Sequence, residues 1–325
     1  MRILSAISLI LGCFLGAGFV SGREVACYFS RFGSVGYIAC IVSGILFFLL
    51  VGFFFVISTR VKSTEEFICC YFAKSKSIVE WLFAICILII TGSMFAGTSA
   101  LASSLKLSEF LVVSITIALT FGVVCRNVKG LECVNVFLVP ILILILILTM
   151  KRGVISEVNN GSLWDSIISG GGYVFINIIS LGLLIIEIGY KYSKREKFLI
   201  TLICSLVITG LLIGVNFSII SNGLVDNIMP NLELSSRNFV LYTAMQISIY
   251  LGLFTTLISN VFLLSNFVNK YIKNKVFSVV VSIVLGVVIS LLGFDNLVGS
   301  VYIFIAVVGL IVVIFALKKN RNFVD

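Results

Sequence analysis

The 325-residue chain has no histidine and only two prolines, Pro140 and Pro230, and charged residues make up 11% of it. A water-soluble domain carries roughly 25% charged residues, so this shortage excludes an ordinary soluble core. The missing histidine removes the residue most used in proton relays, metal sites and acid–base catalysis. Nine cysteines are present, and their odd number without C-x-x-C or zinc-like spacing argues against a disulfide framework.

Apolar residues make up most of the chain: 60% of it is hydrophobic, and the mean hydropathy is +1.22. A helix needs about 20 apolar residues to cross the hydrocarbon core of a bilayer. Ten segments meet this requirement: 3–29, 33–59, 78–105, 107–125, 130–150, 167–190, 197–221, 237–268, 276–293 and 297–317. The sequence therefore predicts an all-α polytopic protein in the lipid bilayer, with a single transmembrane domain over residues 1–325.

The basic residues are unevenly divided between the two sides of these predicted spans. The side that carries the N-terminus holds 17 Lys and Arg residues and the opposite side holds 5. Because basic loops stay in the cytoplasm, both termini are expected there, in the inner (plasma) membrane of a cell. The net charge of +9 is then a topology signal, and no nucleic-acid partner is expected. The first span lacks a small-x-small cleavage site and is interpreted as retained.

The ten spans divide into two halves of nearly equal length, 3–150 and 167–317. Five is an odd number, so the second half must enter the membrane from the opposite side. Inverted repeats whose first helices are discontinuous are a recurring plan of transporters. The sequence predicts this 5+5 arrangement, with breaks in the first and sixth spans.

The first span contains the stretch Gly16-Ala-Gly-Phe-Val-Ser-Gly-Arg-Glu24. A break here would expose backbone N–H groups that suit a carboxylate, so Gly16, Ala17, Gly18 and Ser21 are candidate substrate-binding residues. The alternative is close packing of a continuous helix through small-xxx-small spacing. Arg23 and Glu24 are costly in a membrane and are a candidate gate. Their expected partners are Asp226, Glu233 or Asp295.

The sixth span carries small and polar residues at two places. Ser169-Gly-Gly-Gly172 lies near its start, and Asn177, Ser180 and Gly182 lie near its middle. Together with Ser93 of the third span, the middle group is expected to border the substrate, and Phe175 is expected to cover it. Helix packing is the alternative for the small residues, and core packing is the alternative for the aromatic ring.

The eighth span offers oxygen ligands on one helix face. Gly252, Thr255 and Thr256 are three and four residues apart, so one carbonyl and two hydroxyls can lie together. Such oxygens suit a hard monovalent cation. The alternative is that each threonine hydroxyl bonds back to its own helix.

The motif of the first span resembles the bacterial YkvI-like membrane proteins, relatives of the amino acid–polyamine–organocation superfamily. The resemblance implies a LeuT-type fold with substrate between spans 1, 3, 6 and 8. In sodium-coupled members, the backbone of span 1 and the hydroxyls of span 8 hold an ion. Those positions fall near Gly12, Leu15, Gly252, Thr255 and Thr256.

These observations predict a secondary active transporter of an amino acid or a related small carboxylate, coupled to Na⁺ and needing no other cofactor. Coupling to protons, or exchange, is a variant of this hypothesis. The second hypothesis is a membrane sensor that binds a ligand without transporting it. An enzyme is not expected, because no nucleophile–base grouping and no paired intramembrane carboxylates are found. A homodimer is a possible form of the protein that the sequence does not decide.

Overall fold

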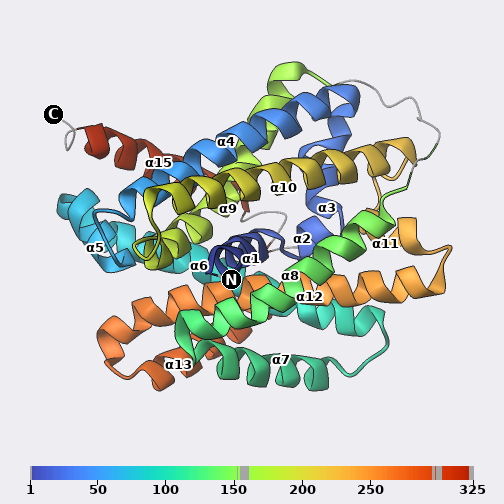
Figure 1. Ribbon diagram of the computed structural model, residues 1–325. Coiled ribbons are helices and arrows are strands. Elements are labelled where there is room, and N and C mark those ends of the chain that lie inside the picture. Colours follow the sequence, from blue (N-terminus) through green and yellow to red (C-terminus); the bar gives the residue numbers. More distant parts are fainter. Residues whose placement is uncertain (1, 152, 154–160, 295–296, 298–301, 322–325) are drawn as a thin grey trace. The chain divides into compact units, whose positions relative to one another are not determined.

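The computed structural model describes residues 2–151, 153, 161–294, 297 and 302–321, and every regular element among them is a helix. Most of the predicted spans correspond to one continuous helix each (Figure 1). The main helices after the first span are α4 (Gly36–Ile57), α6 (Lys76–Ser104), α7 (Glu109–Val124), α8 (Asn127–Thr149), α9 (Leu163–Gly189), α10 (Lys194–Ser221), α12 (Phe239–Ile272), α13 (Lys275–Ser290) and α15 (Tyr302–Arg321). Shorter elements connect them: η1 (Ser30–Val35), α5 (Thr64–Tyr71), η2 (Ala73–Ser75) and α11 (Pro230–Ser235).

Among the described residues, seven helices are long and apolar enough to cross a membrane. Three shorter apolar helices, Arg2–Phe14, Glu109–Val124 and Lys275–Ser290, coincide to within one residue with parts of the ranges predicted for spans 1, 4 and 9. The start of the predicted tenth span lies outside the described residues. The all-helical, multi-pass architecture agrees with the sequence, whereas ten crossings and the inverted repeat stay predictions.

The first span is interrupted, as predicted. It consists of α1 (Arg2–Phe14), α2 (Ala17–Val20) and α3 (Arg23–Tyr28), which Figure 1 shows as separate coils. Gly16 is extended, with φ −69° and ψ 174°, and Gly22 has a φ of 85°. A positive φ of this size is readily adopted only by glycine. Glycine therefore sets the second interruption, between α2 and α3.

The break predicted in the sixth span is wrong, because α9 runs without interruption from Leu163 to Gly189. Gly170 and Gly182 serve close packing instead, whereas a methyl group on Gly171 or Gly172 would meet nothing within 4 Å. A methyl group on Gly170 would lie 2.6 Å from the Ser43 hydroxyl, and one on Gly182 would lie 2.6 Å from the ring of Phe54. A glycine costs a helix about 1 kcal/mol, but a broken backbone in lipid costs several times more. The helix therefore stays intact wherever nothing else can bind its freed groups.

The chain forms two compact units, each assembled from both halves of the sequence. The first comprises Met1–Leu49, Glu132–Val174 and Leu199–Thr256, and the second comprises Leu50–Leu131, Phe175–Phe198 and Leu257–Asp325. Each has its own apolar core, with the fully buried rings of Phe19 and Phe29 in the first unit and those of Phe67 and Phe95 in the second.

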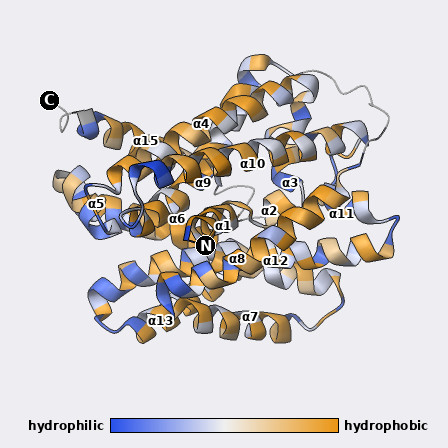
Figure 2. Ribbon diagram, viewed as in Figure 1, coloured by the Kyte–Doolittle hydropathy of each residue, from blue (hydrophilic) through white to orange (hydrophobic). Residues whose placement is uncertain are grey.

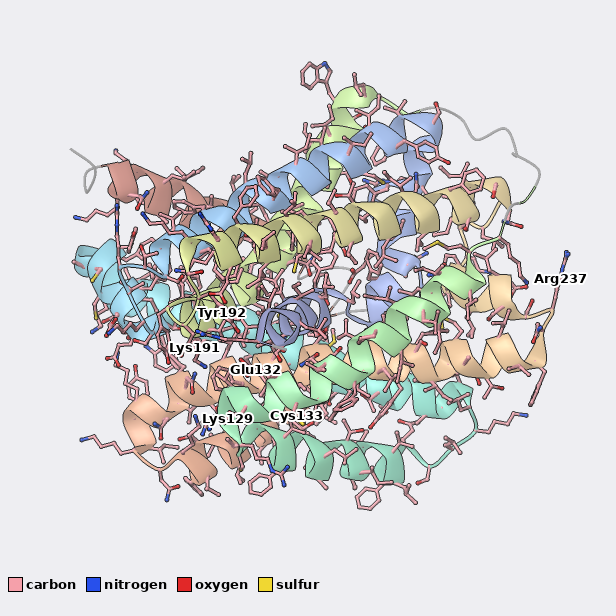
Figure 3. The ribbon with its side chains drawn as sticks, in the orientation of Figure 1. Lys129, Glu132, Cys133, Lys191, Tyr192 and Arg237 are labelled. Carbon is pink, nitrogen blue, oxygen red and sulfur yellow. The ribbon has the colours of Figure 1, made fainter. Side chains whose placement is uncertain are left out.

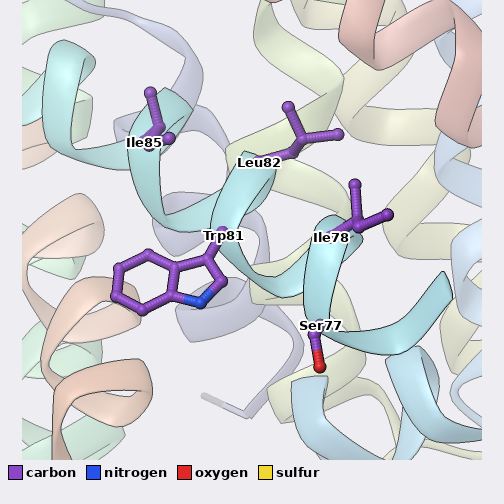
Figure 4. A pocket seen from close by; sticks show the side chains of 5 residues that line it. All are labelled: Ser77, Ile78, Trp81, Leu82 and Ile85. Carbon is purple, nitrogen blue, oxygen red and sulfur yellow. The ribbon is translucent and has the colours of Figure 1, made fainter.

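Large apolar side chains point outward in both units, as expected of helices in contact with lipid. Figure 2 shows hydrophobic residues along the helices and hydrophilic residues mostly near helix ends. A groove of about 350 Å³ on the outer face of α6 is lined by Ser77, Ile78, Trp81, Leu82 and Ile85 (Figure 4). Its lining is apolar apart from Ser77, so it offers little to recognise a polar solute and suits contact with lipid.

A group of charged residues holds α5 in the second unit. Lys270 of α12 donates to the nearly buried Glu80 of α6 at 2.6 Å, and it lies 3.5 Å from Glu65 of α5. Glu187 of α9 accepts a hydrogen bond from the Thr64 amide, at the first residue of α5, at 2.9 Å. The carboxylates of Glu80 and Glu187 thus both engage groups from other elements.

Replacing Lys270 with Met should destabilise the protein by about 2 kcal/mol, because a buried carboxylate loses its partner. The double variant K270M/E80Q should recover most of this loss, since no buried charge then remains. Thermal unfolding of the purified protein in detergent measures both effects. Lys273, which is exposed just beyond α12, supplies the control K273M. Equal midpoints for K270M and K273M would contradict the prediction.

Candidate functional site

The end of α1 meets α12 inside the first unit. Because α1 stops at Phe14, the amide of Gly16 donates to the carbonyl of Phe14 rather than continuing the helix back to Gly12. The Thr256 hydroxyl donates to the carbonyl of Gly12 at 3.2 Å and also lies 3.4 Å from the carbonyl oxygen of Cys13. A side chain of α12 thus contacts the carbonyl end of the broken helix, whereas the cation site itself stays a prediction.

The backbones of the two segments also approach each other closely. A methyl group added to Gly252 would lie 2.9 Å from the carbonyl oxygen of Leu15. One added to Gly16 would lie 3.4 Å from the Thr256 hydroxyl. Thr255 differs, because its hydroxyl donates to Gly252 of its own helix at 3.2 Å. The structure therefore brings Gly12, Leu15, Gly252 and Thr256 together, and the hydroxyl of Thr255 follows the alternative that the sequence left open.

Asn135 of α8 belongs to the same group and was missed from the sequence. It is fully buried, and a methyl group on Gly12 would collide with its side-chain oxygen Oδ1. The charged residues of α8, Lys129 and Glu132, lie closer to the start of the helix (Figure 3). A lone amide deeper in an apolar span is costly and calls for a functional explanation. That signal was present in the sequence.

At the second interruption, between α2 and α3, a residue of α11 bonds to the exposed backbone. The backbone amide of Asn231 donates to the carbonyl of Ser21, and its side chain donates to Val20, both at 2.9 Å. The Ser21 hydroxyl donates to the carbonyl of Gly18 at 3.2 Å, so in this structure Ser21 serves the helix itself. The polar backbone at this interruption thus has protein partners.

The two predicted gate residues, Arg23 and Glu24, contact different parts of the first unit. The Arg23 guanidinium donates to the backbone carbonyl of Asn227 at 3.3 Å, rather than pairing with a carboxylate of Asp226 or Glu233. Asp295, the third expected partner, lies outside the described residues. Glu24 turns the other way: a methyl group on Gly18 would collide with its carboxylate, and the Tyr173 hydroxyl of α9 faces it.

The remaining candidates lie in the second unit. The Ser93 hydroxyl donates to the carbonyl of Ile89 in its own helix at 2.9 Å. Ser180 of α9 donates to the side chain of Asn260 of α12 at 2.6 Å, and both residues are buried. The carbonyl of Phe175 lies against Gly309 of α15, and Asn177 is half-buried. Among these candidates, a hydrogen bond between side chains of different helices is seen for Ser180. Roles in substrate binding stay predictions for all of them.

Comparison with solved structures defines the class of fold. The chain resembles transporters of the LeuT fold. It matches the nucleobase-cation-symport-1 family transporter Mhp1, in a closed conformation with bromovinylhydantoin bound, with a TM-score of 0.63 at 12% identity over 92% of this chain and 75% of that one. It also matches a Na⁺-coupled sialic acid symporter in a substrate-bound outward-open state. The TM-score is 0.65 at 12% identity, over 95% of this chain and 76% of that one. A mutant form of the manganese transporter of Eremococcus coleocola matches with a TM-score of 0.61 at 13% identity, over 93% of this chain and 73% of that one.

Among curated proteins, the chain is similar to YkvI of Bacillus subtilis (strain 168), an uncharacterized membrane protein. The two are 26% identical over 309 residues, which cover 90% of this chain and 88% of YkvI. No protein-family model matches the chain. The resemblance expected from the sequence is thereby confirmed, and the fold is that of membrane transporters.

Replacing Gly12 with Ala should lower the thermal unfolding midpoint, because the added methyl collides with Asn135 and lies 2.9 Å from Val139. Overpacking of this kind costs about 1–3 kcal/mol. The double variant G12A/N135A should recover part of the loss. Gly210→Ala in α10 is the matched control, since a methyl there meets nothing within 4 Å. The contact would be refuted if G12A behaved like G210A.

Proposed function

We propose that this protein is a secondary active transporter that moves an amino acid or a related small carboxylated solute by alternating access, coupled to Na⁺. The observation that carries the proposal is the hydrogen bond from Thr256 across to the carbonyl end of α1. It joins the two elements from which the cation site was predicted. The likeness to transporters of the LeuT fold supports the same class of function.

The proposed Na⁺ site is built from uncharged oxygens. Its ligands are the carbonyls of Gly12 and Leu15, the Thr256 hydroxyl, and an oxygen from Gly252 or Thr255. The partial negative charge at the end of α1 favours a cation. Oxygens that share an octahedral cation at about 2.4 Å are about 3.4 Å apart. The separations of Thr256 from the Gly12 and Cys13 carbonyls, 3.2 and 3.4 Å, are close to this value.

Two alternative functions predict different results in transport experiments. Proton coupling or exchange keeps the transporter but predicts uptake that does not respond to a Na⁺ gradient. A ligand sensor on the same fold predicts binding without any flux. The similarity to a symporter named as Na⁺-coupled favours the sodium-coupled form.

Replacing Thr256 with Ala should weaken Na⁺ dependence of uptake by about tenfold, which corresponds to roughly 1.4 kcal/mol. The measurement is uptake of labelled L-amino acids into proteoliposomes, with and without an inward Na⁺ gradient. Thr209→Ala is the control, because the half-buried Thr209 also lies in the first unit but its hydroxyl bonds back to Ser205 of its own helix. Equal Na⁺ dependence in the wild type and T256A would remove the proposed site.

We also propose that both termini lie in the cytoplasm, with the chain in the plasma membrane. Cysteines introduced at Lys151 and Lys194 should then react with an impermeant maleimide from opposite faces of the membrane. Lys194 is exposed and Lys151 is half-buried, and the exposed native Cys70 and Cys133 should first be replaced by Ser. Labelling of both positions from one face would overturn the topology.

A further inference from the structure

The groove on the outer face of α6 has the dimensions of a lipid chain (Figure 4). Its lining begins at Ser77, in the first turn, and ends at Ile85, about 12 Å further along the helix at 1.5 Å per residue. The hydrocarbon half of one leaflet is about 15 Å thick. The groove therefore extends over most of the depth of one leaflet, as an acyl chain lying along the helix would.

Three aromatic rings border the groove on the side of α12. The ring of Trp81 is 5.4 Å from that of Phe267 and 6.2 Å from that of Tyr271, and these last two are 5.5 Å apart, measured between centroids. All three residues belong to the second unit. Trp and Tyr gather where hydrocarbon meets the lipid headgroups, because each joins an apolar ring to a polar N–H or O–H group. The cluster therefore places this end of the groove at the level of the headgroups.

Lysines lie at the same end of the groove. Lys270 donates to Glu80, and Lys76, at the start of α6, is close enough to interact with the charges of both. Lys273 is exposed three residues beyond Lys270. Against the carboxylates of Glu80 and the largely exposed Glu65, these three lysines leave one net positive charge. A phosphodiester headgroup carries one negative charge, so it complements this end of the groove.

A second protein helix fits this face less well than a lipid does. Helices associate in a bilayer through small residues, which let their backbones approach closely. The side chains that project here are bulky: Ile78, Trp81 and Ile85 are 66%, 54% and 44% exposed. A flexible acyl chain can follow such an uneven surface, whereas a rigid helix would be held away from it by the indole ring.

We propose that the groove on α6 binds one acyl chain of an anionic phospholipid, whose phosphate lies among Lys76, Lys270 and Lys273. By the proposed topology, this is the cytoplasmic end of α6 and α12, and the cytoplasmic leaflet carries anionic lipids. The inference does not depend on the proposed transport function, because the site would bind lipid whether or not a solute is moved.

The chain contains two tryptophans, which supply a matched pair of fluorescent reporters. Trp81 lies in the groove, whereas Trp164, 72% exposed in the first turn of α9, belongs to the other unit. The variants Trp164→Phe and Trp81→Phe each keep one of them. Each variant is reconstituted into phosphatidylcholine vesicles that contain an equal small fraction of either phosphatidylglycerol or phosphatidylcholine with brominated acyl chains. Bromine quenches an indole that it contacts, so quenching reports how strongly each lipid binds beside the reporter.

In W164F, brominated phosphatidylglycerol should bind beside Trp81 about fivefold more strongly than brominated phosphatidylcholine, the effect of one net charge at the membrane surface. In W81F, the two lipids should quench Trp164 equally. Adding K76Q/K273Q to W164F should abolish the preference and leave quenching by brominated phosphatidylcholine unchanged. The single variant K273Q, at an exposed position, should lower the preference at least twofold and serves if the double variant does not fold.

The matched control for charge is K62Q/K194Q, which removes two exposed lysines that lie outside α6 and α12 and should keep the preference. Equal quenching of Trp81 by the two lipids would overturn the inference, as would a preference that K76Q/K273Q retains. The same preference at Trp164 would reduce the effect to a general surface attraction and reject the site. Quenching of Trp81 by neither lipid, in a protein that is dimeric in solution, would reject it in favour of a second copy of the chain.

Discussion

The structure of the first unit depends on how an interrupted helix satisfies its backbone in apolar surroundings. Lipid offers no partner for a free N–H or C=O group, so each one exposed by the break needs a protein partner or a ligand. The protein supplies them from segments far away in the chain. Thr256 binds the carbonyl end of α1, and Asn231 binds the carbonyls of Val20 and Ser21. Long-range hydrogen bonds thus hold the break that glycine permits.

The same requirement explains why the sequence located one break and misplaced another. Glycine clusters occur in both the first and sixth spans. Glycine can form a tight turn, and it can also allow two helices to pack closely. In the first span, Gly22 adopts a positive φ and polar partners are available. In α9, Gly170 and Gly182 instead accommodate Ser43 and Phe54. Which use applies depends on residues that pack there from elsewhere, so local sequence alone could not decide it.

Span positions were predictable because lipid imposes length and hydrophobicity on each segment. The contacts of the candidate site were less accessible. The spacing in the eighth span identified Gly252 and Thr256, and the family resemblance implied Gly12, but the proximity of Asn135 follows from packing between α1 and α8. Arg23 and Glu24 are adjacent in sequence, yet successive helix residues point about 100° apart. That divergence sends Arg23 to the loop at Asn227 and Glu24 to Gly18, an outcome that a simple gate pair did not anticipate.

Two features that favour positive charge lie on either side of one short segment. The carbonyl end of α1 lies before Leu15, and the Glu24 carboxylate lies over Gly18, beyond it. A rotation of the backbone at Leu15 or Gly16 would change both, because Leu15 contributes the carbonyl next to Gly252 and Gly16 begins α2. The proposed ion at the end of α1, or a positive charge beside Glu24, would therefore favour particular conformations of the same residues. Coupling needs a two-state element that both ligands bias, and the interrupted first span, which lies at the proposed ion site, is where we expect that element.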